Sequence, residues 1–202
     1  MPNTLYTGDL PDSFDAGDAV AIDTEAMGLR FGRDRLCLVQ ISTGDGSASF
    51  VQIRREQSKA PNLQKILENR SILKIFHFAR FDVALLYQTF GVLASPVYCT
   101  KIASKIARTY TNQHGLSALV AELLNLEISK EKQSSDWGSG ELSEAQLQYA
   151  ANDVLYLHRI RSLLDRMLER EGRADLAASC FEFLPTRAKL DIGGWPEDIF
   201  AH

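Results

Sequence analysis

Two acidic residues, Asp23 and Glu25, interrupt an otherwise largely apolar segment, DAVAIDTEAM, at residues 18–27. The segment is predicted to be a β-strand, in which side chains two residues apart point to the same face. The two carboxylates therefore share a face, where they repel each other and raise each other's pKa. A divalent cation such as Mg²⁺ relieves that repulsion because it prefers oxygen ligands. The alternative is a pair of solvent-facing acids on a sheet edge.

A third and a fourth acid occur among mostly apolar neighbours in segments with helical periodicity. Asp82 lies in FARFDVALLYQTF, and Asp153 lies in QLQYAANDVLYLHRI. Acidic residues are seldom buried without a partner. Tyr149 precedes Asp153 by four residues, so its phenol and the carboxylate point into one space. Each acid also fits a structural role, Asp82 as a cap or a partner of Arg80 and Asp153 as an acceptor within the core.

Four acids from three separate elements form a set that suits a two-metal phosphodiesterase. In such sites two divalent ions about 3.5–4 Å apart clamp a phosphodiester, one activating the water and the other stabilising the leaving oxygen. Tyr149 would orient that water or help to deprotonate it. The predicted metal ligands are Asp23, Glu25, Asp82 and Asp153.

The composition restricts the class of protein. A chain of 202 residues is long enough for one domain whose core needs no disulfide or metal. The three widely spaced cysteines indicate neither a disulfide framework nor a zinc site, and they fit a reducing cytoplasm. No signal peptide or membrane span is expected. The net charge of −4 argues against a broad basic surface for long nucleic acids, so contacts with nucleic acid are expected to be short or mediated by cations.

The pattern of elements predicts one mixed sheet flanked by helices. We expect strands at residues 18–27, 36–43, 48–53 and 72–77, with helices at 61–70 and 80–90. The second half is predicted to be helical at 100–108, 116–124 and 174–184. A further long helix is expected to begin at a capping box formed by Ser143 and Gln146 and to end at about Arg170. A polar loop is expected at 130–140, and an irregular tail follows the last helix.

Three motifs in this chain resemble those of the DnaQ-like, or DEDD, 3′–5′ exonucleases in their RNase D branch. These motifs are DTE at 23–25, IFHFARFD ending at Asp82, and YAANDVLYL, whose tyrosine four residues before the aspartate is typical of the DEDDy subclass. Two further stretches, GLSALVAELLNLEISK and QSSDW, resemble the RNase D block around Lys130 and Ser135-Asp136-Trp137.

The resemblance covers residues 18–165. It implies an α/β, RNase H-like fold, dependence on Mg²⁺ or Mn²⁺, and stepwise release of 5′-mononucleotides. We expect residues 1–202 to form a single exonuclease domain, with a core at 18–165, a C-terminal helix and tail at 174–202, and no HRDC domain.

A second resemblance narrows the expected substrate. The stretches DRLCLVQISTGDG, CTKIASKIARTYTNQHGL and FLPTRAKLDIGGWPEDIFAH resemble the nanoRNase C family, stand-alone relatives of RNase D. That resemblance implies diribonucleotides as the substrate and assembly into a homo-octameric ring. The apolar tail residues Trp195, Ile199 and Phe200 could dock on a neighbouring subunit or fold back on the core of their own chain. The alternatives are an exonuclease that acts on longer RNA 3′ ends or DNA, and a catalytically inactive nucleic-acid-binding protein.

Basic residues and a histidine are candidates for substrate contacts. Lys101, Lys105 and Arg108 recur at helical spacing as one stripe, which could hold phosphates or could be an ordinary solvated face. His77 precedes the second motif, where it either meets the scissile phosphate or packs in the core.

Apolar and aromatic side chains could contact the bases. Leu29 follows Gly28, which permits close approach, and in related dinucleotide-cleaving enzymes a leucine at this place inserts between the two bases; an ordinary loop residue is the alternative. Trp137 could stack on a base or could fix its loop to the core. The remaining charges of the turn, on Arg30, Arg33 and Arg35, are interpreted as a charged hairpin tip.

Overall fold

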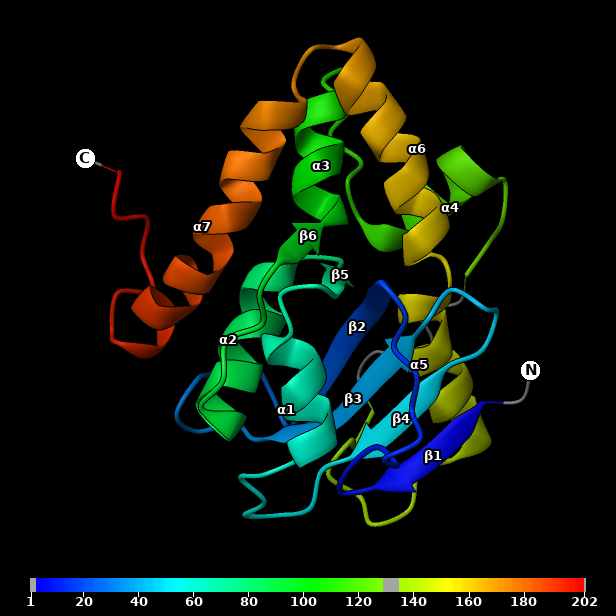
Figure 1. Cartoon of the computed structure of the whole chain (residues 1–202), viewed down its shortest axis with the longest axis vertical. Coiled ribbons are helices and arrows are strands. Elements are labelled where there is room, and N and C mark those ends of the chain that lie inside the picture. The colour runs from blue at the N-terminus through cyan, green and yellow to red at the C-terminus, as the bar shows by residue number, and fades with distance from the viewer. Residues whose placement is uncertain (1–2, 129–134, 202) are drawn as a thin grey trace.

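The computed structural model describes residues 3–128 and 135–201. Within that part of the chain, a six-stranded sheet in the order β1-β4-β3-β2-β5-β6 is flanked by seven helices (Figure 1). The strands are β1 (Thr4–Thr7), β2 (Ala19–Ala26), β3 (Leu36–Ser42), β4 (Ser49–Gln52), β5 (Leu73–Phe76) and β6 (Val97–Cys99). The helices are α1 (Pro61–Glu68), α2 (Ala79–Phe90), α3 (Thr100–Ala107), α4 (Leu116–Leu124), α5 (Glu144–Leu155), α6 (Leu157–Arg170) and α7 (Ala174–Ile192).

Strand β2 lies inside the sheet, antiparallel to β3 and parallel to β5. On β2, Asp23 is in register with Gln40 of β3, and Glu25 is in register with Leu38. The two acids of β2 are therefore not on a sheet edge, which excludes the solvent-facing alternative. The predicted mixed sheet flanked by helices is confirmed.

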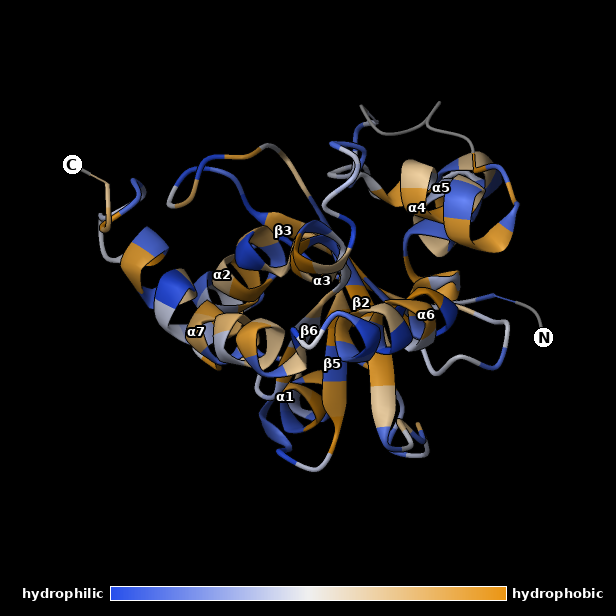
Figure 2. Cartoon of the chain, turned by 90° about the horizontal axis from the view of Figure 1, so that it is seen from above, coloured by the Kyte–Doolittle hydropathy of each residue, from blue (hydrophilic) through white to orange (hydrophobic). Residues whose placement is uncertain are grey.

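Helices cover the sheet and enclose its apolar residues. In Figure 1, α1 and α2 lie in front of the strands and α5 lies behind them. The apolar segments of β2 and β5 lie among the surrounding helices in Figure 2, and every residue of β3 is buried. None of the helices in the described ranges is long and apolar enough to cross a membrane.

Two strands were not predicted. β1 is a four-residue strand that joins the edge of the sheet by parallel pairing with β4, and β6 is a three-residue strand that pairs with β5. β1 is largely exposed and β6 has only three residues, so neither gives the buried apolar run by which the short strands β4 and β5 were predicted. Only their pairing with a neighbouring strand identifies them.

The long helix predicted to run to Arg170 is wrong in one respect, since it divides into α5 and α6 at Tyr156. Neither proline nor glycine occurs at this point, so nothing in the sequence indicated a break. Beyond the break, the imidazole Nε2 of His158 lies 3.1 Å from the carbonyl oxygen of Ser42 at the end of β3. The first turn of α6 is thus held against the end of β3 by His158.

The last helix was predicted to end at residue 184, before Pro185, but α7 continues to Ile192. Proline inside a helix costs about 3 kcal/mol because one hydrogen bond is lost and its ring clashes with the preceding turn. Tertiary contacts offset that cost. Asp191 in the last turn accepts hydrogen bonds from Arg80 of α2 at 2.6 and 2.8 Å and from Arg187 at 2.9 Å.

Replacing Asp191 by alanine should lower the free energy of unfolding by about 2–3 kcal/mol, because the carboxylate is buried and its loss leaves Arg187 without its carboxylate partner. This is less than for a fully buried pair, since Arg80 is partly exposed. Urea denaturation followed by circular dichroism measures the effect. Arg170→Ala, which breaks an exposed pair with Glu171, is the matched control and should change stability by less than about 0.5 kcal/mol. Equal small losses in both variants would refute this role of Asp191.

Candidate active site

Three of the four predicted acids meet where β2 and α5 pack together. Each of Asp23, Glu25 and Asp153 offers a carboxylate oxygen, and these oxygen atoms all lie within 4.8 Å of one another. Asp23 and Glu25 come from alternate positions of one strand, and Asp153 comes from the helix packed on it. The fold therefore brings together acids that are far apart in the sequence. The result is a cluster of three carboxylates that could bind a metal ion.

The fourth acid, Asp82, approaches from the first turn of α2. Helix α2 begins shortly after β5, the parallel neighbour of β2, so its first turn lies beside the acids of β2. The hydroxyl of Thr24 donates a hydrogen bond to Asp82 Oδ1 at 2.6 Å and fixes the carboxylate, which is buried. The charge of Asp82 also raises the pKa values of Asp23 and Glu25, which places it within electrostatic reach of the cluster.

The carboxyl groups lie next to one another; Asp82 is buried and the other three are partly buried. Burial, followed by repulsion from its acidic neighbours, raises the pKa of Asp23 well above its usual range and that of Glu25 to about 9. Burial likewise raises the pKa values of Asp82 and Asp153 to about 7. These carboxyl groups retain protons because, within the part of the chain that the structure describes, no positive charge lies among them. A divalent cation such as Mg²⁺ suits the cluster, since it supplies positive charge and prefers oxygen ligands.

Tyr149 lies one turn before Asp153 on α5 and hydrogen-bonds to its carboxylate. Burial and the neighbouring acids raise the pKa of the Tyr149 hydroxyl above its usual range. The phenol therefore keeps its proton at neutral pH and can donate a hydrogen bond. The hydrogen bond to Asp153 places the phenol beside the acids, and its role in orienting a water or in helping to deprotonate it stays a prediction.

A cavity of about 750 Å³ opens in front of the acids. Its lining includes Asp23, Glu25 and Asp82 together with Leu29, His77, Phe78, Phe81, Ser135 and Trp137. Leu29 is the most prominent apolar residue there, with 82% of its surface exposed. Its loop is fixed because the carboxylate of Asp34 accepts a hydrogen bond from the backbone N–H of Arg30 at 3.0 Å. A side chain at Gly28 would collide with that carboxylate, which explains the glycine.

His77 lines this cavity as a neutral base. The hydroxyl of Thr100 lies 2.9 Å from Nδ1 of His77 and 3.2 Å from the carbonyl oxygen of Phe76, to which it can donate. When the hydroxyl donates to that carbonyl, Nδ1 of His77 carries the proton and Nε2 is the acceptor. Burial, and secondly the charge of Lys101, lowers the pKa of His77 to about 3. A neutral acceptor cannot bind phosphate oxygens by charge, but it can accept a hydrogen bond from a hydroxyl.

The expected basic stripe on α3 is not formed, because Arg108 is completely buried. Its guanidinium forms an ion pair with Glu122 and donates hydrogen bonds to Ser104 Oγ and the carbonyl oxygen of Gln113. Arg108 therefore joins α3 to α4 and is not available to a phosphate. Lys105 is exposed on α3 and is not among the residues that line the cavity.

Trp137 is buried, with 3% of its surface exposed, and its ring centre lies 6.1 Å from that of Tyr149. Of the two predicted roles, this position favours fixing the loop to the core. Part of the predicted polar loop, including Lys130, lies outside the described residues.

Several side chains that support the acids were not predicted. Thr24 sits between the two acids of β2 and holds Asp82, and Gln40 Nε2 lies 3.4 Å from Asp23 Oδ2. Their polar side chains within buried strands could have indicated these roles, since buried polar groups need partners. Arg35, interpreted as part of a hairpin tip, instead donates to backbone carbonyls of the sheet and of the loop that contains Trp137. No sequence signal indicated this contact.

Comparisons with known proteins agree with this geometry. A family described as 3′-5′ exonuclease matches residues 9–169. Brucella melitensis NrnC has been solved with bound Mg²⁺; it is 56% identical, with a TM-score of 0.96, and the match covers all of both chains. Its structure bound to pGG is 57% identical, with a TM-score of 0.97 over 100% of this chain and 99% of that one.

Ribonuclease D of Gluconacetobacter diazotrophicus is 38% identical over 160 residues, which is 79% of this chain but 40% of that protein. The chain thus spans less than half the length of this curated relative. Escherichia coli RNase D is 27% identical with a TM-score of 0.76, covering 86% of this chain and 46% of the other. The chain belongs to the 3′–5′ exonuclease family, in its RNase D branch.

Without a divalent cation, the wild-type protein should lose stability as pH rises from about 5 to 9. The unfolded acids ionise near their ordinary pKa values of about 4, whereas in the folded state they retain protons up to about 7 to 9. Over this interval the folded state binds more protons, so stability falls with rising pH. Melting temperatures measured in EDTA between pH 5 and 9 test this expectation.

Asp23→Asn should reduce this pH dependence and raise the melting temperature at pH 8, because one charge of the acidic cluster is removed. Asp18→Asn, which alters an exposed acid just before β2, is the matched control and should behave like the wild type. Mg²⁺ should raise the melting temperature of the wild type more at pH 8 than at pH 5.5, because protons compete with the cation. Identical pH dependence in the wild type and Asp23→Asn would contradict the electrostatic interpretation.

Proposed function

We propose that this chain is a 3′–5′ exoribonuclease that hydrolyses very short oligoribonucleotides and releases nucleoside 5′-monophosphates. It hydrolyses the single phosphodiester of a diribonucleotide most efficiently. The convergence of the four acids beside one cavity supports the hydrolytic part. The match over the full chain to Brucella melitensis NrnC, solved with pGG, supports the dinucleotide as substrate. A cavity of about 750 Å³ is also of a size that suits a small ligand.

The proposed cofactors are two Mg²⁺ or Mn²⁺ ions per active site, held by Asp23, Glu25, Asp82 and Asp153. When bound, such ions activate the attacking water and stabilise the leaving oxygen of an in-line displacement. The bond that breaks joins phosphorus to the 3′ oxygen of the preceding nucleotide. That oxygen takes a proton and becomes a new 3′ hydroxyl, while the water oxygen stays on the released 5′-phosphate.

The other side chains act on the position of the substrate and the water. The Tyr149 hydroxyl, hydrogen-bonded to Asp153, orients the attacking water. Leu29, exposed at the mouth of the cavity, inserts between the two bases. His77, which lines the cavity, accepts a hydrogen bond at Nε2 from a ribose hydroxyl.

The proposal includes assembly into a homo-octameric ring. Support comes from the resemblance to the nanoRNase C family and from the exposure of three apolar residues near the C-terminus: Trp195, Ile199 and Phe200 are 59%, 46% and 79% exposed. Apolar side chains gathered at the surface are typical of contacts between subunits.

Action on longer RNA is the second candidate. Escherichia coli RNase D, which shares the fold at 27% identity, is described as an exoribonuclease involved in structured RNA processing. The acids and Tyr149 would serve either substrate equally, so the difference lies in the preferred length.

A ladder of 5′-labelled oligoribonucleotides from two to twenty residues should be cleaved in Mg²⁺ or Mn²⁺ with kcat/KM highest for the dinucleotide. Products resolved on denaturing gels should show removal of one nucleotide at a time from the 3′ end. Asp23→Asn should be inactive while retaining its fold, and Asp18→Asn should be fully active. Equal kcat/KM for twenty-residue and two-residue RNA would favour the second candidate, and an inert wild type would refute both.

Tyr149→Phe should lower kcat by about 10²-fold or more, because the hydroxyl that orients the water is removed, while the affinity for Mg²⁺ should change little. Steady-state kinetics on the dinucleotide and calorimetric titration with the metal measure the two effects separately. An unchanged kcat would show that Tyr149 acts only in packing.

A further inference from the structure

We propose that Arg35 and Gln52 are positioning residues, which brace the loop at residues 135–140 from the sheet and thereby hold Trp137 against Tyr149. The inference rests on the proposed function, because it assigns to both residues an effect on the hydroxyl of Tyr149. Neither side chain lines the acidic cavity, so neither is expected to contact the substrate.

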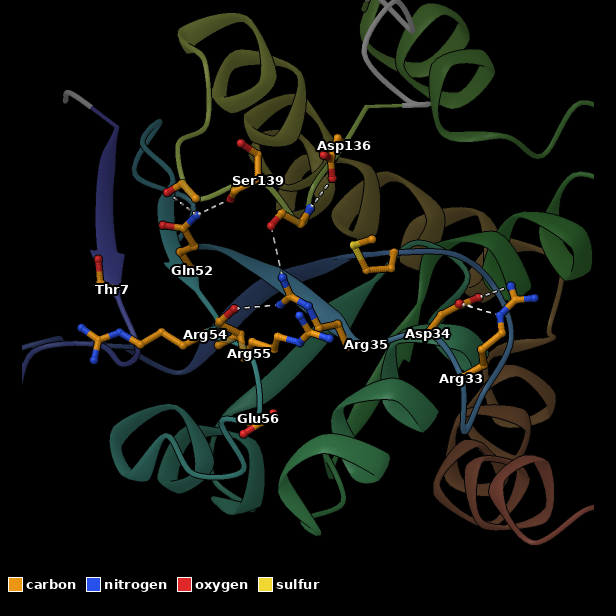
Figure 3. A pocket seen from close by; sticks show the side chains of 14 residues that line it. Thr7, Arg33, Asp34, Arg35, Gln52, Arg54, Arg55, Glu56, Asp136 and Ser139 are labelled. Carbon is orange, nitrogen blue, oxygen red and sulfur yellow. Dashed lines mark hydrogen bonds and ion pairs between the residues drawn. The ribbon is translucent and has the colours of Figure 1, made fainter.

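The contacts of the loop with the sheet are made by side chains that point toward its backbone (Figure 3). The Arg35 guanidinium donates to the carbonyl oxygen of Gly138 at 3.3 Å. The Gln52 amide donates to the carbonyl oxygens of Ser139 and Gly140 at 3.2 and 3.3 Å. Residues 135–140 contain no helix or strand. Side chains such as these, and not a ladder of backbone hydrogen bonds, therefore set the position of the loop.

Arg35 is itself held in place by the sheet. The same guanidinium donates to the carbonyl oxygens of Leu36 at 3.3 Å and Ile53 at 3.1 Å, which tie it to the start of β3 and the end of β4. Hydrogen bonds from an ionised donor are stronger than those between neutral groups. Arg35 can therefore hold Gly138 at a fixed position relative to the sheet.

The opposite side of the loop contacts α5. Trp137, the residue before Gly138, is buried with its ring near that of Tyr149. Gln146 on the same helix donates from Nε2 to the carbonyl oxygen of Asp136 at 3.3 Å. The loop thus lies between the sheet and the helix that contributes Tyr149 and Asp153. If Gly138 shifts, the neighbouring indole moves with it, and the phenol of Tyr149 loses part of the surface that fixes its orientation.

The space beside these contacts allows such a shift. A cavity of about 950 Å³ borders the loop, and its lining includes Arg35, Gln52, Arg55, Gly138 and Ser139 (Figure 3). Met27 packs against Gly138, and the rest of this side of the loop borders open space. On the side that faces the sheet, the hydrogen bonds from Arg35 and Gln52 are the polar restraints on the loop, and removing them should loosen it without opening the apolar core.

The experiment compares Arg35→Gln with Arg55→Gln, which alters an exposed arginine of the same cavity that has no part in the bracing contacts. With the full-length protein, Mg²⁺ and a diribonucleotide, Arg35→Gln should lower kcat by about tenfold, since small misplacement of a reacting group is costly. KM should change less than twofold, and Arg55→Gln should match the wild type. In a Tyr149→Phe background, Arg35→Gln should cause no further loss.

A readout independent of activity follows the indole directly. In a Trp195→Phe background, Trp137 is the only tryptophan of the 202-residue sequence. Its fluorescence should shift to the red, and acrylamide should quench it more strongly, in Arg35→Gln but not in Arg55→Gln. Arg35→Lys should restore part of kcat, because it retains a charged donor. Gln52→Met should reproduce the fluorescence change and serves as the test if Arg35→Gln does not fold.

The outcomes separate the two proposals. An active wild type with unchanged kcat and unchanged Trp137 quenching in Arg35→Gln would refute the bracing role alone, as would an equal loss in the Tyr149→Phe background. An inactive wild type would refute the proposed function, and the fluorescence measurements would still show whether the brace exists.

Discussion

Repulsion among clustered, partly or fully buried carboxylates is the constraint on which this structure depends. Asp23, Glu25 and Asp153 offer oxygen atoms within 4.8 Å of one another, and Asp82 is buried beside them. Charges so placed destabilise the folded chain unless protons or a cation neutralise them. The rest of the fold must supply the stability that this cluster removes, and it does so with an internal strand, β3, that is buried along its whole length.

The same constraint explains why the acids come from different elements. The strand β2 supplies two acids at fixed spacing, while α2 and α5 each bring one more from a different direction. Side chains of the framework then limit their movement: Thr24 holds Asp82, and the Tyr149 hydroxyl contacts Asp153. A site built on packed strands and helices can keep its geometry in spite of repulsion, whereas acids on mobile loops would move apart.

Around this framework, the two sides of the cavity differ in how they are supported. Leu29 projects from a turn that the Asp34 side chain organises, so its exposure is stable although it costs hydrophobic burial. Trp137, by contrast, is buried on a loop without regular secondary structure, which Arg35, Gln52 and Gln146 hold from two directions. Hydrogen bonds from side chains thus connect the sheet to α5, which carries Tyr149. They do so through a loop that has no ladder of backbone hydrogen bonds.

The sequence by itself determined which segments with strong periodicity form strands and helices. It singled out the four acids and Tyr149 as a candidate site, because strand alternation and a helical turn are local properties. It also indicated the family, since the motifs around these residues are short and contiguous. Tertiary structure alone decided what depends on distant neighbours. The burial of Arg108 against Glu122 and the continuation of α7 through Pro185 each required a partner in another element, as did the support that Arg35 gives to Gly138. Local sequence patterns cannot show such partners, because contacts between distant segments exist only once the chain has folded.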